Sequence, residues 1–124
     1  FFDTSPFLQY SELDDLNESL ILFLQKRRPK VAFFVQWDNE FYPDTLDQLR
    51  SSLGITCINW CTDDSWRFRE HSLIIGKNYD LMITTEPSLV DRYSDAGINA
   101  SSESWGYSRL WQLQPRKWYL LRRL

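Results

Sequence analysis

The chain has 124 residues, a mass of 14.9 kDa and a net charge of −3, with 43% apolar and 25% charged residues. This is the size and composition of one ordinary folded domain, which excludes intrinsic disorder, collagen-like repeats and a disulfide-stapled miniprotein as descriptions of the whole chain. No apolar run approaches the ~18 residues of a membrane-spanning helix, so no transmembrane segment is predicted.

Charge is unevenly distributed along the chain. Residues 109–124 carry five basic side chains and no acidic one, so the preceding residues carry a net charge of −8. An acidic body lacks the clustered cations that neutralise phosphates in nucleic-acid-binding proteins. We therefore predict that nucleic acid is not a partner.

The cysteines and the start of the chain bear on its location. Cys57 and Cys61 fall on or beside one predicted strand, four positions apart, which is too far for a disulfide on a straight strand. The sequence starts at Phe1 without a methionine and without the apolar core of a signal peptide. These features predict a reduced, cytoplasmic protein and a fragment of a longer chain.

The first predicted elements are a helix and a strand. The helix is expected to begin at Ser11, which forms a capping-box pattern with Asp14, and to stop at Pro29. Between them, apolar residues recur with the 3.6-residue period of an amphipathic helix. The run at residues 31–37 is apolar on both faces, as in a strand covered on both sides.

Strands and helices then alternate to the end of the predicted domain. Helices are expected at residues 43–54, 66–75 and 85–97, and strands at residues 55–60, 79–84 and 98–100. Short apolar strands that alternate with helices indicate βαβ units and a parallel sheet. We therefore predict an α/β fold with a Rossmann-like parallel sheet, helices on both faces and a single domain.

The carboxyl ends of the predicted strands carry acidic, hydroxyl and indole side chains. Ligands of open parallel sheets bind at this edge. Carboxylates and hydroxyls can hold the hydroxyl groups of a polyol, and an indole face can cover the C–H side of a sugar ring. No glycine-rich turn or lysine stands there to hold a phosphate. The candidates for this cleft are Asp38, Glu40, Asp63, Asp64 and Thr85.

Other roles for these residues stay open. Helix capping accounts for some of Asp63, Asp64 and Thr85, although it does not require both aspartates. Trp37 and Trp60 at the strand ends either face a ligand or belong to the core.

Several kinds of catalytic site are disfavoured. The acid pairs resemble metal ligands, but no second set of ligands has a suitable spacing, so no metal site is predicted. The only histidine, His71, is predicted on a helix, at the surface or half-buried. A phosphate-receiver domain would need a lysine after the last strand, and a serine hydrolase would need G-x-S-x-G. No catalytic residue is assigned.

Two segments carry a family resemblance. N-W-x-x-D-D-x-W occupies residues 59–66, and Y-D-x-x-x-T-T occupies residues 79–85. With residues 29–34, 45–49 and 93–97, their order and spacing resemble the N-terminal half of CgeB-like glycosyltransferases of the spore-maturation-protein type. The resemblance covers residues 29–108.

The resemblance implies half of a two-domain, GT-B-like enzyme. Residues 1–108 would be its Rossmann-like N-terminal domain, and residues 109–124 a basic, aromatic segment that does not resemble a second Rossmann domain. In such proteins the C-terminal domain binds the nucleotide-sugar donor, and the N-terminal domain shapes the side of the cleft that receives a carbohydrate or glycan acceptor.

The family's strand-end motif falls on Asp63, Asp64 and Trp66, which the resemblance places in the cleft. It also implies transfer without a metal held by an acid pair. We expect this chain to hold no cofactor and, without the missing donor domain, to transfer no sugar alone.

A non-catalytic interaction module is the second hypothesis. Aromatic residues stand among the five basic residues near the C-terminus, and aromatic residues with arginine are frequent anchors of protein interfaces. This hypothesis predicts a protein partner held by Trp111 and Trp118. Alternatively, these aromatic residues cover an edge of the sheet.

Overall fold

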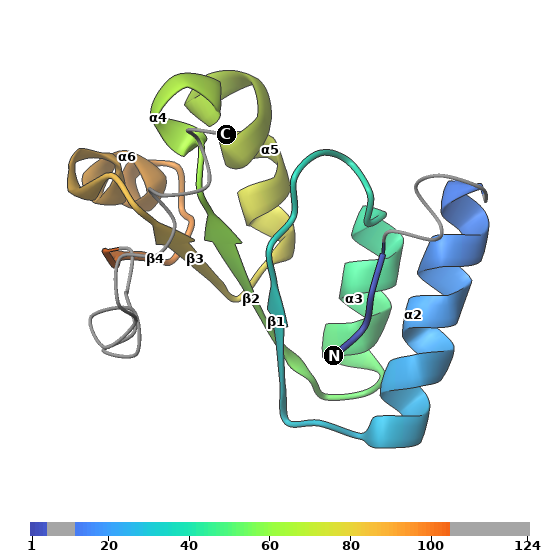
Figure 1. Ribbon diagram of the computed structural model, residues 1–124. Helices are drawn as coiled ribbons and strands as arrows, with labels where there is room; N and C mark the ends of the chain where they lie inside the picture. The colour runs from blue at the N-terminus through green and yellow to red at the C-terminus, as the bar shows by residue number, and fades with distance from the viewer. Residues whose placement is uncertain (5–11, 105–124) are drawn as a thin grey trace, which may run out of the picture.

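The computed structural model describes residues 1–4 and 12–104 (Figure 1). They form a four-stranded, all-parallel sheet with the strand order β1-β2-β3-β4, flanked by helices. In chain order the elements are α2 (Leu13–Arg27), β1 (Val31–Phe34), α3 (Pro43–Ser51), β2 (Thr56–Cys61), α4 (Asp64–Arg67), the π-helical turn η1 (Phe68–Ser72), α5 (Leu73–Ile75), the 3₁₀ turn η2 (Gly76–Asn78), β3 (Leu81–Thr84), the 3₁₀ turn η3 (Pro87–Leu89), α6 (Val90–Asp95) and β4 (Ala100–Ser102). The predicted α/β fold with a parallel sheet is confirmed.

Helix α2 lies close to its predicted position. It begins after Glu12, and the predicted cap Ser11 lies outside the described residues. It ends before Arg28, whose φ of 48° is in the left-handed region. Pro29 follows, and a proline disfavours α-helical backbone in the residue before it. None of the helices in the described part of the chain has the length and apolar character needed to cross a bilayer.

One face of the sheet holds the core. Along β1, Ala32 and Phe34 are buried whereas Val31 and Phe33 are exposed. Leucines of α2 and α3 pack against the buried side chains of β1. The strand register continues the same buried face across the sheet through Cys57, Asn59, Cys61, Met82 and Thr84.

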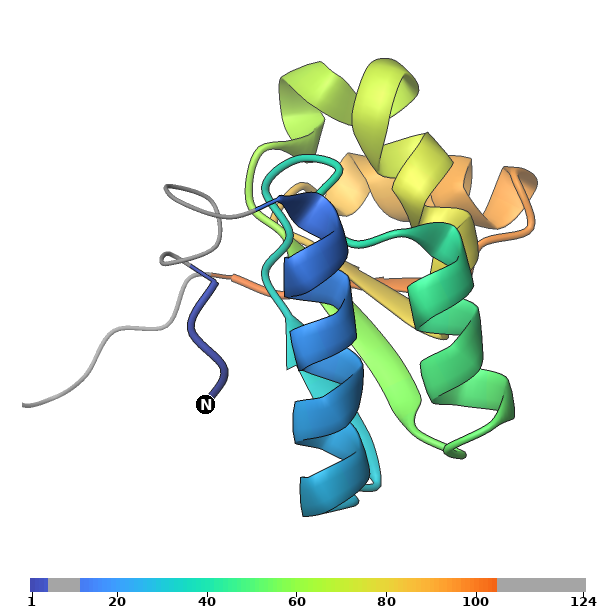
Figure 2. The same cartoon turned by 90° about the vertical axis from the view of Figure 1, so that its right-hand side faces the viewer.

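The strand order explains why the core is one-sided. Each crossover moves the chain in the same direction across the sheet, so right-handed crossovers place their helices on the same face. Figure 2 shows α3, α5 and α6 on one side of the sheet, with the N-terminal segment on the other. The sequence predicts helices on both faces of the sheet. Within residues 1–4 and 12–104, the helices cover one of the two faces.

The helix predicted at residues 66–75 is divided into several pieces. Helix α4 runs into the π-helical turn η1, then into α5 and the 3₁₀ turn η2. The wider π turn carries His71 and Ser72, and both are buried. Single π turns within helices are frequent at functional sites. Here the turn lies next to the carboxyl edge of the sheet.

Candidate binding site at the carboxyl edge of the sheet

The parallel sheet brings the predicted site residues to a common edge. Asp38 and Glu40 follow β1, Asp63 and Asp64 stand at the end of β2, and Thr85 follows β3. Trp66 lies on α4, directly after the second pair. The strands therefore place their polar ends together as the sequence predicts, although the side chains differ widely in their exposure.

A small hollow lies between the ends of β1 and β2. Its volume is about 10 Å³, which is close to the space needed for one water molecule. Of the predicted site residues, Asp63 and Asp64 line it. The full lining consists of Gln36, Trp37, Cys61, Thr62, Asp63, Asp64, Arg67, His71 and Ser72.

Arg67 joins the two strand ends across this hollow. Its Nη1 donates to the Trp37 carbonyl oxygen at 2.6 Å, and its Nη2 lies 3.5 Å from Asp38 Oδ1. The guanidinium carbon stands 5.6 Å from the ring centre of Trp37 and 5.4 Å from that of Trp66. Both indoles remain largely open to solvent, at 60% and 69% exposure. The edge of the hollow therefore presents two exposed indole rings next to the Arg67 guanidinium. We call this surface, formed by Trp37, Trp66 and Arg67, the rim.

Asp64 lies beneath the rim, in the core. Its side chain is 1% exposed, and its Oδ2 accepts a hydrogen bond from the Tyr93 hydroxyl at 3.0 Å. Burial raises the pKa of this carboxyl above its ordinary value, and the neighbouring Thr84 and Tyr93 hydroxyls oppose the rise. The raised pKa favours a neutral carboxylic acid, which can donate as well as accept a hydrogen bond.

Two buried polar atoms at the hollow lack a hydrogen-bond partner within the described residues. They are Asp64 Oδ1 and His71 Nε2. Both residues line the hollow and both are more than nine-tenths buried. A buried polar atom without a partner costs about 1–3 kcal/mol, so a hydroxyl group or a water molecule that reached both atoms would bind favourably.

A buried hydrogen-bond network supports the floor of the hollow. Gln36 N donates to Asn59 Oδ1 at 3.0 Å, and the Tyr79 hydroxyl donates to Gln36 Oε1 at 2.5 Å. Gln36 Nε2 donates in turn to the Asp38 carbonyl oxygen at 2.6 Å. Because these bonds link β1, β2 and the segment before β3, the hollow is held by rigid elements.

The remaining predicted residues have separate positions. Glu40 is mostly buried, and its carboxylate accepts from Trp37 N at 3.1 Å and from Asp38 N at 2.8 Å, which shapes the turn after β1. Asp63 is half-buried at the hollow, whereas Thr85 is half-buried but does not line it. Asp63 is therefore the acidic side chain among these that lies both at the hollow and within reach of solvent.

The thiol at the hollow is not activated. Burial raises the pKa of the Cys61 thiol to about 11, so it stays protonated at neutral pH. Cys57 and Cys61 are both free and buried. Within the described residues no group of three or more His, Cys, Asp and Glu side chains could hold a metal ion.

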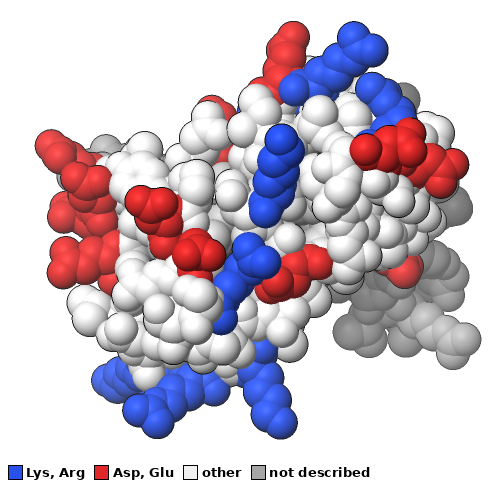
Figure 3. Space-filling model, turned by 180° about the vertical axis from the view of Figure 1, so that it is seen from behind, with Lys and Arg blue, Asp and Glu red and all other residues white. Residues whose placement is uncertain are grey.

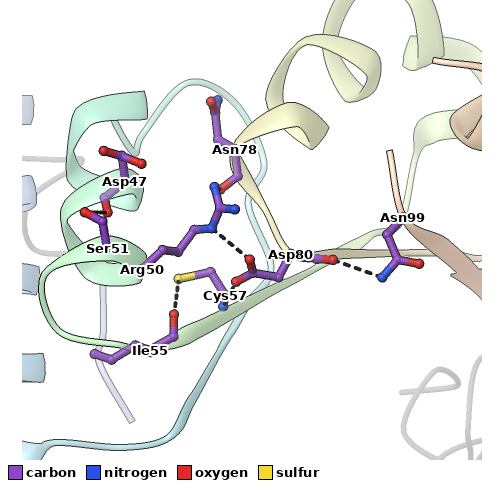
Figure 4. Close-up of polar contacts among 8 residues, drawn as sticks. All are labelled: Asp47, Arg50, Ser51, Ile55, Cys57, Asn78, Asp80 and Asn99. Carbon is purple, nitrogen blue, oxygen red and sulfur yellow. Dashed lines mark hydrogen bonds and ion pairs between the residues drawn. The ribbon is translucent and has the colours of Figure 1, made fainter. Parts of the chain in front are cut away.

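Asp80 of the second motif lies away from the hollow, at the amino end of β3. Its carboxylate accepts from Arg50 Nε at 2.9 Å and from Cys57 N at 2.7 Å (Figure 4). Asn99 Nδ2 donates to its carbonyl oxygen at 3.1 Å. Asp80 thus ties α3, β2, β3 and the approach to β4 together, which is a structural role.

Sequence reasoning did not assign six residues of the hollow to the site: Gln36, Cys61, Thr62, Arg67, His71 and Ser72. A signal existed for Gln36, a polar residue inside an otherwise apolar strand run. The positions of His71 and Ser72 depend on the π turn, which has no comparable sequence pattern.

No protein-family model matches the sequence, and no curated protein matches it.

Proposed function

We propose that this chain is the acceptor-side, Rossmann-like domain of a glycosyltransferase and that its carboxyl rim binds a carbohydrate. The observation that carries the proposal is the pair of exposed indoles, Trp37 and Trp66, beside a hollow with unpaired polar atoms. Indole faces pack on the C–H faces of sugar rings, and hydroxyl groups need nearby donors and acceptors. The resemblance of residues 59–66 and 79–85 supports the same function.

The rim matches a hydroxyl-bearing ligand better than a phosphate. Its charged groups are the cation of Arg67, already paired with Asp38, and the acidic side chains beside it. The hollow has room for one hydroxyl group or water molecule, so most of a sugar would lie on the exposed indole surfaces. Binding of this kind is shallow, and we expect millimolar dissociation constants for short oligosaccharides.

The experiment is a titration of the isotope-labelled protein with a panel of short oligosaccharides, followed by nuclear magnetic resonance. The expected result is that at least one oligosaccharide shifts the indole N–H signals of Trp37 and Trp66. Trp66→Ala and Asp63→Ala should weaken this binding while the rest of the spectrum stays unchanged. Leu22→Ala is the matched control, because Leu22 is an exposed apolar residue of α2 away from the rim.

Two outcomes would count against the proposal. One is a panel that shifts no rim signal at millimolar concentration, and the other is binding that Leu22→Ala weakens as much as Trp66→Ala. A parallel transfer assay with nucleotide sugars tests the prediction that this chain needs a separate donor-binding domain for activity. We expect no transfer by this chain alone, and turnover would refute that expectation.

The interaction-module hypothesis remains a second prediction. Its residues, Trp111 and Trp118, lie outside the described residues. It predicts that a protein partner is lost on Trp111→Ala and kept on Asp63→Ala, whereas the carbohydrate proposal predicts that Asp63→Ala weakens sugar binding.

A further inference from the structure

The outer edge of β1 is open within the described part of the chain. β1 stands at the end of the strand order and pairs with β2 alone. Thr56 N donates to the Lys30 carbonyl oxygen at 2.9 Å, and Gln36 N donates to Asn59, so residues 30 and 36 turn their peptide groups toward β2. Peptide groups alternate in direction along a strand. The residues that turn theirs to the open edge are therefore Val31, Phe33 and Val35.

A groove of about 790 Å³ lies along this edge. Residues 31–35 form one wall, residues 1–4 contribute the opposite wall, and side chains of α2 line it between them. The Phe2 ring packs on the Phe23 ring with centroids 5.3 Å apart, which holds the N-terminal segment against α2. The volume is in the range of cavities that hold a ligand.

The groove is apolar where it meets β1. Val31, Phe33 and Val35 are 50%, 54% and 63% exposed, which is unusual for neighbouring residues of a parallel sheet. An exposed apolar edge strand is a template for pairing with another strand. Val31, Phe33 and Val35 thus offer their peptide groups for hydrogen bonds and their side chains for packing.

Two charged side chains, Arg27 and Asp3, line the groove. Arg27 lines it at the end where β1 begins, and Lys26, Arg28 and Lys30 are close to it in the chain. Figure 3 shows basic side chains at this end of the molecule and acidic side chains toward the other end of α2, where Asp14 and Asp15 form its first turn. A strand with an acidic residue beside Arg27 would be electrostatically matched.

We propose that the groove beside β1 receives an extended strand of another polypeptide, which pairs in parallel with the β1 edge and places an acidic residue beside Arg27. Peptide hydrogen bonds would give affinity, and alternate apolar side chains would fill the groove. Both walls of the groove belong to this chain, which favours a single extended segment over the sheet edge of a second folded copy. This inference is independent of the carbohydrate site.

The experiment uses two synthetic peptides and the full chain. The first is acetyl-Asp-Val-Thr-Ile-Thr-Val-amide, whose apolar side chains alternate and whose acidic residue stands at the start of the strand. The second replaces the aspartate with lysine. We expect the first peptide to bind more tightly and to slow amide hydrogen exchange at Val31, Phe33 and Val35, with little change at Ala32 and Phe34, which already face β2.

A matched pair of variants tests the hydrogen-bonding edge. Val35→Ala and Val35→Pro both shorten the side chain, but only the proline removes the outward N–H. A proline is tolerated on an edge strand when that N–H does not pair within the sheet. We expect Val35→Pro to bind the peptide about fivefold more weakly than Val35→Ala, the effect of one lost hydrogen bond. Circular dichroism should show both variants folded.

Three results would overturn the proposal. The first is equal binding of the two peptides, or none at millimolar concentration. The second is equal affinity of Val35→Ala and Val35→Pro for the aspartate peptide. The third is a dimer in sedimentation analysis whose β1 amides are protected without peptide, because the edge would then be occupied by a second copy. If Val35→Pro unfolds, the amide-exchange pattern of the unmodified protein decides the question.

Discussion

Replacing Asp80 with alanine should cost more stability than any exposed ion pair would explain. The carboxylate holds two groups at once: the Arg50 guanidinium and the backbone N–H of Cys57, a residue with no exposed surface. Loss of the acceptor leaves that N–H unsatisfied in the core. The change therefore tests whether Asp80 stabilises the protein mainly by its hydrogen bond to Cys57 N in the sheet or by its partly exposed ion pair with Arg50.

The magnitude follows from the two contacts. An unsatisfied buried donor costs about 1–3 kcal/mol. The ion pair adds only about 0–1 kcal/mol, because the side chains of Arg50 and Asp80 are each 33% exposed and water screens their attraction. Asp80→Ala should therefore destabilise the protein by about 1–4 kcal/mol, a large share of the roughly 5–15 kcal/mol available to a domain.

Urea unfolding of three variants provides the assay. Asp80→Asn keeps an oxygen for Cys57 N and should retain much of the stability, whereas Arg50→Ala should cost no more than about 1 kcal/mol. The amide of Cys57 should also exchange faster in Asp80→Ala. The reasoning fails if Arg50→Ala is as damaging as Asp80→Ala, or if the Cys57 amide keeps its protection.

Two further predictions concern buried titratable groups. Burial raises the pKa of Asp64 in the folded protein, so ionisation of this carboxyl opposes folding. The free energy of unfolding should therefore fall as the pH rises from about 4, the ordinary pKa, through the raised pKa. Asp64→Asn should therefore match the unmodified protein in acid and exceed it near neutral pH in urea unfolding; a constant difference across that range would contradict this. Burial also raises the pKa values of the Cys57 and Cys61 thiols to about 11. Both should react slowly with a thiol reagent at about pH 8 until the protein unfolds, and fast reaction of the folded protein would argue against the buried positions.

The order of strands and helices could be predicted from the sequence because local chemistry sets it. Pro43 begins α3 as expected, and Gly54 and Gly97 follow the predicted helices with φ values of 65° and 74°, a region that favours glycine. The coverage of the sheet could not be read in this way. Residues 31–37 are apolar on both faces, but which face a helix covers depends on the strand order, a long-range property.

The common edge of the candidate residues could be predicted from the fold, but the depth of each side chain could not. Parallel strands must bring Asp38, Asp63 and Thr85 to one edge, so their common location followed from the fold. The burial of each side chain did not follow from the fold. The pattern Asp63-Asp64 does not reveal that the carboxylate of Asp64 turns inward to Tyr93 on α6. That contact joins residues 29 positions apart, which no local pattern can specify.

The sequential strand order has a consequence for how the molecule forms. Paired residues of successive strands are separated by 25, 23 and 18 positions along the chain. Each of the four strands in the described residues therefore pairs with the strand made just before or after it, and none of these four has to wait for a distant partner. Loops of similar length close at similar entropic cost, so the sheet can assemble one unit at a time during synthesis.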